Sequence, residues 1–341
     1  MPLSTSNSDT MNNNNNNSWF YTWILVIILC VGVLGSYELF LKNKGFVASI
    51  ENNNNLWSWY RGKVNNKPNS LVIIGASRSQ LDINIPYLKE KLSSYDVYQL
   101  SINGHYPMAT FKALADDEEF VGTLIVSLNA QAMEEFYFDM QLPQNEFYQN
   151  KSTIYKSLDA YLSALLQSKL RLLHPLLGLQ QVVEFYDSNK AFKTVFYTTA
   201  NIDQSVSANY SLTNVENLYR HFVSSKEENY KNEPPTAPNL WQQNIKLLLE
   251  YSEKIKSRGG QVILIRFPTD RGHWELDENY YPRKQYWNKI SDQIKLNTVH
   301  FKDINGLDQF ALPDSSHLDQ KDTIEFTEKL FNELIKREYI N

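Results

Sequence analysis

A short apolar run followed by three small residues limits what this chain can fold into more than any other feature. Residues 71–74 are four consecutive β-prone apolar residues, which predict a strand buried on both faces. Gly75, Ala76 and Ser77 follow, and small residues let the backbone turn sharply at the carboxyl end of the strand. Ligands of open parallel α/β sheets bind at that end, so Ser77 is a candidate functional residue. The alternative is that Ser77 only caps the next helix.

The rest of the chain alternates apolar runs with helical patterns, which predicts an α/β fold. We expect a parallel sheet with right-handed crossovers between helical layers, that is, a flavodoxin-like three-layer arrangement. The remaining predicted strands cover residues 97–101, 123–128, 262–266 and 299–302. The predicted helices cover residues 86–93, 107–117, 239–258, 282–295 and 320–337.

The alternation is interrupted between residues 134 and 236. Leucines at helical spacing over 157–184 predict one or two helices, and 192–212 is rich in Thr, Val, Tyr and Ser, which favours irregular strands. Pro234-Pro235 closes this region. We interpret it as a largely helical insertion that covers the sheet. The folded domain is therefore expected over 71–341.

The N-terminal part has a different composition. Residues 1–17 form an Asn-rich tail that is expected to be disordered. Residues 18–41 are predicted to be a transmembrane helix, because 18–37 contains no charge and 20 residues cross about 30 Å. A cleaved signal peptide and a buried core helix are the alternatives, but no basic region precedes the apolar run. Residues 42–70 are interpreted as a polar connector whose tryptophans dock on the domain or lie near the bilayer.

Charge and cysteine content exclude several classes of function. The net charge of −5 and the lack of an arginine-rich run argue against nucleic acid as a partner. Cys30 is the only cysteine, so neither an internal disulfide nor a Cys-based zinc site can form. No paired His or carboxylate spacing indicates a metal, and no Gly-rich loop indicates a nucleotide, so no cofactor is expected.

A second cluster of chemically active residues lies between the last strand and the last helix. Asp314 precedes His317 by three residues, a spacing that lets the carboxylate hydrogen-bond the imidazole and fix its tautomer. His317 then has the properties of a general base for the Ser77 hydroxyl. The alternative is a turn formed by Asp314 beside a surface histidine.

Two further loops at the same edge offer donors for an oxyanion. Gly104 follows the second strand and presents a backbone N–H at close approach, and Asn129 follows the third strand with a side-chain amide. The alternatives are a turn with positive φ at Gly104 and a helix cap at Asn129.

This ordered set resembles the SGNH/GDSL hydrolase superfamily. The residues that carry the resemblance are Gly75-Ala76-Ser77, Gly104, Asn129 and Asp314-x-x-His317. The resemblance implies that Ser77 is the nucleophile, that Gly104 and Asn129 form the oxyanion hole, and that Asp314 and His317 complete the triad. The sequence departs from the family at Ala76, where many members carry Asp, at Arg78, where many carry Leu, and at Ser127, where Gly is usual.

The Gly-x-Ser-Arg form behind an N-terminal apolar helix looks most similar to members that modify cell-envelope polysaccharides, such as alginate-acetylation and D-alanyl-transfer proteins. That similarity implies a bacterial inner-membrane protein with an extracytoplasmic domain. Lys42 and Lys44 follow the helix and point to the opposite orientation by the positive-inside rule. We give the resemblance the greater weight.

Other charged residues near the predicted edge are candidates for substrate binding. Arg78 and Arg266 follow strands and suit an anionic group, although salt bridges or caps at strand ends explain them as well. His105 is expected to border the same pocket, and His273 lies in a loop that can reach it. The other histidines, at 174, 221 and 300, are interpreted as structural.

The sequence therefore predicts a membrane-anchored SGNH-type serine esterase or O-acyltransferase. Its substrate is expected to be an envelope glycan or another ester, the bilayer is expected to hold residues 18–41, and a membrane acyltransferase is a candidate partner. A scaffold of the same fold without catalysis, binding a glycan or membrane partner through 134–236, is the alternative. A flavodoxin-like nucleotide-binding module is disfavoured because only one glycine follows the first strand.

Overall fold

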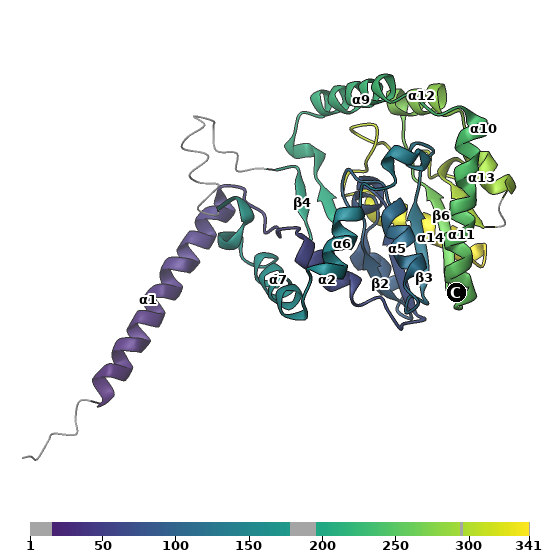
Figure 1. Ribbon diagram of the computed structural model, residues 1–341. Helices are drawn as coiled ribbons and strands as arrows, with labels where there is room; N and C mark the ends of the chain where they lie inside the picture. The colour runs from purple at the N-terminus through teal and green to yellow at the C-terminus, as the bar shows by residue number, and fades with distance from the viewer. Residues whose placement is uncertain (1–15, 178–195, 294–295, 341) are drawn as a thin grey trace, which may run out of the picture.

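Five parallel strands form the central sheet of the protein, in the order β2-β1-β3-β6-β7. The computed structural model describes residues 16–177, 196–293 and 296–340 (Figure 1). The strands are β1 Ser70–Ile74, β2 Asp96–Gln99, β3 Thr123–Ser127, β6 Gln261–Arg266 and β7 Asn297–His300. This is the strand order of flavodoxin-like sheets, with the first strand in the interior. The prediction of a parallel α/β sheet is confirmed.

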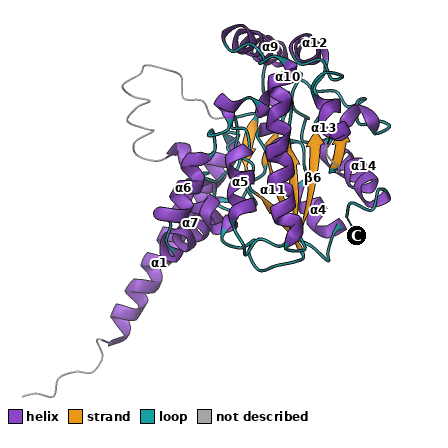
Figure 2. Ribbon diagram, turned by 45° about the vertical axis from the view of Figure 1, so that its right-hand side comes forward, coloured by secondary structure: helices purple, strands orange, loops and turns teal. Residues whose placement is uncertain are grey.

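Helices cover both faces of this sheet (Figure 2). Successive side chains of β1 point to opposite faces, so Leu71 and Ile73 pack in one hydrophobic cluster, whereas Val72 and Ile74 pack in the other. Helices α5 (Met108–Asp116) and α11 (Ile245–Ser257) cover the face of Val72. Helices α4 (Ile85–Lys91) and α14 (Thr323–Lys336) cover the face of Leu71. This arrangement explains why β1 reads as a continuous apolar run.

Several elements differ from the sequence-based expectation. The predicted helix 239–258 is divided into α10 (Pro238–Trp241), a 3-10 turn (Gln242–Asn244) and α11. The loop expected after β6 contains α12 (Arg271–Tyr280), and the helix predicted over 282–295 is the shorter α13 (Trp287–Gln293). Strand β7 ends at His300 because the ring Nδ1 of His300 accepts from the Lys302 N–H at 3.1 Å and begins a 3-10 turn.

The predicted connector 42–70 is partly a structural element of the domain. Residues Asn54–Arg61 form α2, and the Asn53 side chain caps this helix by accepting from two backbone N–H groups. Trp57 on α2 is buried, and its indole N–H donates to the Leu100 carbonyl at 3.1 Å. The asparagine run concealed this helix, since its N-cap is one of several identical residues.

Helix α1 (Asn16–Asn43) projects from the domain (Figure 1). The segment Ser18–Asn43 has a mean hydropathy of 2.4 and is long and apolar enough to cross a membrane. Only 6% of its most apolar window is buried against the rest of the chain. Most of the predicted tail, residues 1–15, lies outside the described residues. Membrane insertion would remove this apolar surface from water.

The insertion begins after two 3-10 turns, Gln131–Met133 and Glu135–Tyr137, and contains helices and a two-stranded hairpin. Within its described residues, the helices are α6 (Leu142–Asn150), α7 (Ile154–Gln167) and α9 (Val215–Asn232). Strands β4 (Thr198–Ala200) and β5 (Val206–Ala208) pair antiparallel in a sheet of their own. The part of the predicted helical region at 178–184 lies outside the described residues. Helix α9 was not predicted, because the sequence from 213 to 232 is strongly polar.

Candidate active site

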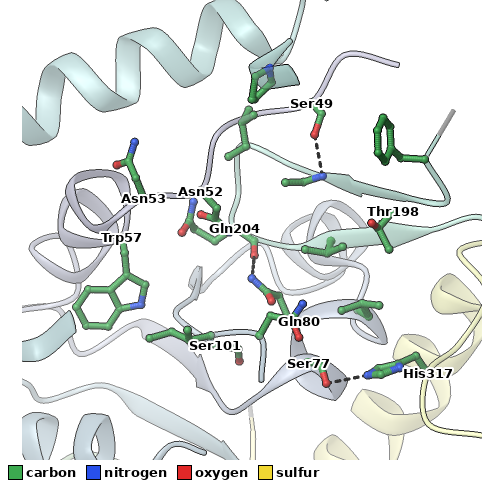
Figure 3. Close-up of a pocket in the computed structure, with 18 of the residues that line it drawn as sticks. Ser49, Asn52, Asn53, Trp57, Ser77, Gln80, Ser101, Thr198, Gln204 and His317 are labelled. Atoms are coloured by element: carbon green, nitrogen blue, oxygen red, sulfur yellow. Dashed lines mark hydrogen bonds between the residues drawn. The ribbon is translucent and has the colours of Figure 1, made fainter. Parts of the chain in front are cut away.

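Three residues from opposite ends of the folded domain form a continuous hydrogen-bonded chain. The Ser77 Oγ lies 2.7 Å from Nε2 of His317 (Figure 3). Nδ1 of His317 lies 2.9 Å from Oδ2 of Asp314. Ser77 is the first residue of α3 (Ser77–Leu81), directly beyond the carboxyl end of β1. Asp314 and His317 lie in the loop between β7 and α14. The structure thus brings together the serine, histidine and aspartate singled out from the sequence.

The turn between β1 and α3 depends on Gly75. A Cβ atom at this position would lie 2.2 Å from the Ser79 Oγ and 2.6 Å from the Ser127 Cβ. Real Cβ atoms essentially never show such contacts, so only glycine lets β1, α3 and β3 approach this closely. The close approach places Ser77 at the rim of the sheet.

The carboxylate of Asp314 is held by several donors. Oδ1 accepts from the backbone N–H groups of Ser316 and His317, at 2.9 and 2.8 Å. Oδ2 accepts from the His317 ring and from the Tyr210 hydroxyl, the latter at 2.6 Å. Burial alone would raise the pKa of Asp314, but His317 and these donors outweigh it and lower the pKa to about 2. Asp314 is therefore ionised at neutral pH.

The ionised Asp314 determines which ring nitrogen of His317 carries the proton. A carboxylate only accepts hydrogen bonds, so Nδ1 of the neutral imidazole must carry the hydrogen and Nε2 must present a lone pair. That lone pair faces the Ser77 hydroxyl at 2.7 Å. The geometry is that of a base positioned to take the serine proton.

Tyr210 is a hydrogen-bond donor to Asp314 that the sequence did not indicate. It belongs to the insertion, in a 3-10 turn (Tyr210–Leu212) after β5, and its side chain is buried. Its backbone N–H also donates to Oδ2 of Asp319 at 3.2 Å. A lone tyrosine in a polar segment carries no pattern that would distinguish it from the other tyrosines of the chain.

Replacing Tyr210 by phenylalanine should lower kcat about tenfold and leave KM and the thermal unfolding temperature nearly unchanged. The variant removes one charge-assisted hydrogen bond from Asp314 but keeps the aromatic ring in place. Steady-state kinetics on an ester substrate and a thermal melt measure these quantities. Tyr339→Phe, in a partly buried tyrosine packed against the core, is the control. An unchanged kcat in the Tyr210 variant would contradict the positioning role.

Two cavities meet at the serine and histidine. The first, about 600 Å³, is bordered by residues of the segment after α1, of α2 and of the β4–β5 hairpin, including Ser49, Asn52, Trp57, Thr198 and Gln204 (Figure 3). Gln80 also borders it and donates to the Gln204 carbonyl at 3.0 Å. We call it the amide cavity, because asparagine and glutamine side chains supply much of its polar lining.

The second cavity, about 300 Å³, contains both predicted oxyanion residues. Gly104 and Asn129 border it together with Ser77 and His317. Gly104 has φ of +73°, and open space lies where its Cβ would be. Asn129 accepts through Oδ1 from the Ala132 N–H at 2.9 Å, so it also caps a 3-10 turn. Both residues thus have the structural roles considered as alternatives, and both lie on the wall of the cavity that holds Ser77.

The predicted substrate-binding residues are distributed unequally. Arg78 and Arg266 border the second cavity, and so does His273. His105 borders neither cavity; its ring Nδ1 lies 2.8 Å from the carbonyl of Asn103, so the side chain folds back on its own loop. The expectation that His105 lines the pocket is not met. His174, interpreted as structural, borders the amide cavity and packs edge-on against Phe46.

Helix α9 contributes side chains that sequence reasoning missed. Phe222, Lys226 and Tyr230 are spaced four residues apart and so lie on one face of the helix. Phe222 borders both cavities and packs against the His317 ring, with centroids 5.4 Å apart. Lys226 is buried and Tyr230 donates to Oδ1 of Asp277 at 2.6 Å. The spacing of a lysine between two aromatics at intervals of four residues is the one sequence signal that could have identified this face.

Asp82 is a second buried carboxyl next to the triad. Its Oδ1 accepts from the Leu318 N–H at 2.9 Å, whereas its Oδ2 has no partner among the described residues. Burial raises the pKa of Asp82 to about 7, although His317 and the Leu318 N–H oppose this shift. Asp82 is the residue after α3, so it links the serine-bearing helix to the histidine-bearing loop.

The raised pKa of Asp82 predicts that the free energy of unfolding falls as the pH rises from about 4 to about 7. An unfolded aspartate releases its proton near pH 4, whereas Asp82 keeps it to about 7, so the folded state binds more protons in this window. The loss is on the order of a few kcal/mol. Chemical denaturation of wild type and Asp82→Asn between pH 4 and 8 measures it. The variant should lose this slope, and equal slopes in both proteins would contradict the prediction.

Comparisons with known proteins leave the family open. No protein-family model matches the chain, and no curated protein matches it. One solved structure that matches is titled "Crystal Structure of TesA". It is 14% identical in sequence, the similarity covers 78% of this chain and 97% of that chain, and the TM-score is 0.34. This chain is thus distantly similar to TesA, at a level that assigns no activity.

Proposed function

We propose that this protein is a membrane-anchored SGNH-type serine esterase or O-acyltransferase that acts through an acyl-enzyme. The observation that carries the proposal is the unbroken chain of hydrogen bonds from Ser77 through His317 to Asp314, with distances of 2.7 and 2.9 Å. A serine hydroxyl is a weak nucleophile until a base removes its proton, and this arrangement supplies the base and orients it. Two cavities at Ser77 provide room for a substrate.

The reaction is expected to proceed in two steps, acylation of Ser77 and then deacylation. His317 takes the Ser77 proton at Nε2 while Oγ bonds to the acyl carbon, and the resulting oxyanion is stabilised by donors from Gly104 and Asn129. Collapse of this intermediate breaks the ester bond, and His317 returns its proton to the departing alcohol. Water or a sugar hydroxyl then gives its proton to His317 and attacks the acyl-enzyme. The bond from the acyl carbon to the Ser77 Oγ breaks, and His317 returns the proton to that oxygen.

The membrane anchor of this proposal is α1. Its apolar span supports insertion into a bilayer, and Glu38 near its end is fixed to the domain by Arg171, with Nη1 and Oε1 3.0 Å apart. We place the domain on the extracytoplasmic side of a bacterial inner membrane. Envelope glycans or other esters are the proposed substrates, and a membrane acyltransferase is the proposed partner.

A non-catalytic scaffold is the competing function. It requires that His317 lie too far from Ser77 for proton transfer, and that the insertion serve only for binding. The 2.7 Å contact favours the enzyme, and so does the fact that the insertion supplies Tyr210 to Asp314. A scaffold has no need of an ionised carboxylate held by four hydrogen bonds behind the histidine.

The proposal is tested by labelling the detergent-solubilised full chain with a fluorophosphonate probe, which reacts with activated serines. Wild type should be labelled, and Ser77→Ala should not. Ser163→Ala, on an exposed part of α7, is the matched control and should label like wild type. Folded wild-type protein that resists the probe would favour the scaffold. Adding a sugar acceptor to an ester assay then separates transfer from hydrolysis.

A further inference from the structure

The second cavity has an excess of positive charge. Arg78, Lys226 and Arg266 all border it, yet one carboxylate, Asp277, serves two of them. Oδ2 of Asp277 lies 2.5 Å from Arg266, and Oδ1 lies 3.7 Å from Lys226. Arg78 forms no ion pair within the described part of the chain. The cavity beside Ser77 is thus bordered by three cations, of which two share the Asp277 carboxylate and one has no ion-pair partner among the described residues.

The polar partners of Arg78 are neutral. Its Nε donates to the Ser316 hydroxyl at 3.1 Å, and its Nη2 donates to Nε2 of His273 at 2.9 Å. Since arginine only donates, His273 must carry its hydrogen on Nδ1, and that buried N–H has no partner among the described residues. Burial and the neighbouring cations hold the pKa of His273 well below its usual value, so the ring stays neutral.

The lowered pKa of Lys226 is consistent with this excess of positive charge. Burial lowers the pKa of its ammonium to about 7, and Arg78 and Arg266 add to this effect, against the opposing attraction of Asp277. A buried cation without a full counter-charge is unfavourable, and an anion brought into the cavity would remove that cost. The neutral amine form of Lys226 would then take up a proton as the anion binds.

We propose that the second cavity binds an oxyanion group of the ester substrate, a carboxylate or a phosphate, through Arg78 and Lys226. This inference rests on the proposed esterase function and adds the class of substrate. Ser77 borders the same 300 Å³ cavity, so the bound anion lies beside the reacting ester. Guanidinium groups pair with both carboxylates and phosphates, and the two sources require separate probes.

The test is calorimetric binding to the full-length Ser77→Ala protein at low ionic strength. The probes are methyl glucuronide, glucose 6-phosphate and methyl glucoside, which differ in the charge at carbon 6. At least one anionic probe should bind about tenfold or more tightly than methyl glucoside, because a charge-assisted contact is gained. Whichever anion is preferred identifies the source. Proton uptake, measured in two buffers, should accompany its binding.

Lys226→Gln should abolish the preference for the anion, whereas Lys231→Gln should preserve it. Lys231 is on the same helix, but it is exposed and paired with Glu227, so it is a matched control. Equal or absent binding of all three probes would overturn the inference, as would an unchanged preference in Lys226→Gln. Fluorophosphonate labelling of wild type is independent of the anion, so labelling without an anion preference would overturn this inference and keep the proposed function.

A second, independent observation concerns α7. Its exposed apolar residues recur at intervals of three and four and form one stripe along the helix. The stripe consists of Ile154, Leu158, Leu162, Leu165 and Leu166, which are 86, 39, 49, 40 and 55% exposed. Soluble surfaces rarely leave such a continuous apolar strip in water.

The stripe is distinct from the face by which α7 packs on the domain. Ala164 is buried against Leu56 of α2, and Tyr161 stacks on Trp59, with centroids 5.0 Å apart. Lys156 and Asp159 lie on a third, polar face. Helix α7 therefore has a second apolar face, in addition to the one that packs on the domain, and this second face is exposed.

The helix lies close to the end of α1 that enters the domain. The 3-10 turn Arg171–Leu173 follows α7 and packs on α1, where the backbone N–H groups of Arg171 and Leu172 both donate to the Glu38 carboxylate. Arg171 also donates to the Phe46 carbonyl at 2.9 Å. Figure 1 shows α7 beside this end of α1, on the side of the domain.

We infer that the stripe of α7 lies in the surface of the lipid bilayer that α1 spans. This inference rests on the membrane anchoring in the proposed function. An amphipathic helix buries its apolar face at the boundary of headgroups and acyl chains, and α1 already brings this part of the chain to the bilayer. The two contacts would fix the orientation of the domain on the membrane.

Cys30 makes the test possible. An environment-sensitive dye is attached to Cys30 of the full chain, and to cysteines introduced by Leu158→Cys, Leu165→Cys and Asp159→Cys in a Cys30→Ser background. In vesicles containing brominated lipids, the dyes at 30, 158 and 165 should be quenched and the dye at 159 should not. If the dyes at 158 and 165 are not quenched while the dye at Cys30 is, the inference about α7 is overturned and the membrane anchor is retained. An unquenched dye at Cys30 would overturn the membrane anchor and this inference together.

Discussion

Replacing His317 by alanine is expected to lower kcat/KM for ester turnover on the order of 10⁴-fold or more. Its Nε2 lies 2.7 Å from the Ser77 Oγ, and no other base among the described residues hydrogen-bonds that hydroxyl. Without it the serine keeps its proton at neutral pH, and the departing alcohol receives none. Steady-state hydrolysis of an activated ester by the purified full chain measures the loss.

Controls separate this loss from a folding defect. His317 is buried, so His317→Gln, which keeps more of the side-chain volume, is measured beside the alanine variant, and both are checked by circular dichroism and thermal unfolding. His221→Ala changes an exposed histidine of α9 and should retain wild-type activity. Ester turnover near the wild-type level in a folded His317 variant would contradict the proposed mechanism.

The second large effect is expected for Asp314→Asn, with a loss of kcat on the order of 10³- to 10⁴-fold. The amide can still accept from the backbone N–H groups of Ser316 and His317, so the loop should keep its conformation. Its NH₂ group, however, donates to Nδ1 of His317 and favours the tautomer with the hydrogen on Nε2. That tautomer has no lone pair for the Ser77 proton.

Activity and fluorophosphonate labelling should fall together in Asp314→Asn, because both require an activated serine. Asp308→Asn, at an exposed site in the same connection to α14, controls for the change of charge. A folded Asp314→Asn protein with more than about a tenth of the wild-type kcat would show that Asp314 has no role in orienting His317.

The central sheet could be predicted because its three interior strands, β1, β3 and β6, are buried on both faces and thus contain uninterrupted apolar runs. The positions after these strands, at Ser77, Gly104 and Asn129, could be selected because parallel strands bring their carboxyl ends to one rim. Asp314 and His317 could be paired from their spacing alone. These inferences needed only the local sequence and one general property of α/β sheets.

The insertion and the N-terminal segment could not be predicted in the same way. Helix α9 has a polar sequence, and what it buries is a lysine and a tyrosine whose partners, Gln131 and Asp277, are distant in the chain. Tyr210 reaches Asp314 across 104 residues. Helix α2 is short and begins in an asparagine run, so its docking on the sheet by Trp57 depends on tertiary contacts. No local pattern encodes such pairings.

Among the residues that the structure describes, the two cavities share only Ser77, Phe222 and His317. In the proposed reaction, the alcohol that leaves through one cavity does not obstruct the water or sugar acceptor that arrives through the other. A covalent intermediate on Ser77 can thus be approached before the first product has diffused away. The released alcohol would then be a noncompetitive rather than a competitive inhibitor with respect to the incoming acceptor. Phe222, which borders both cavities, lies where the two routes meet.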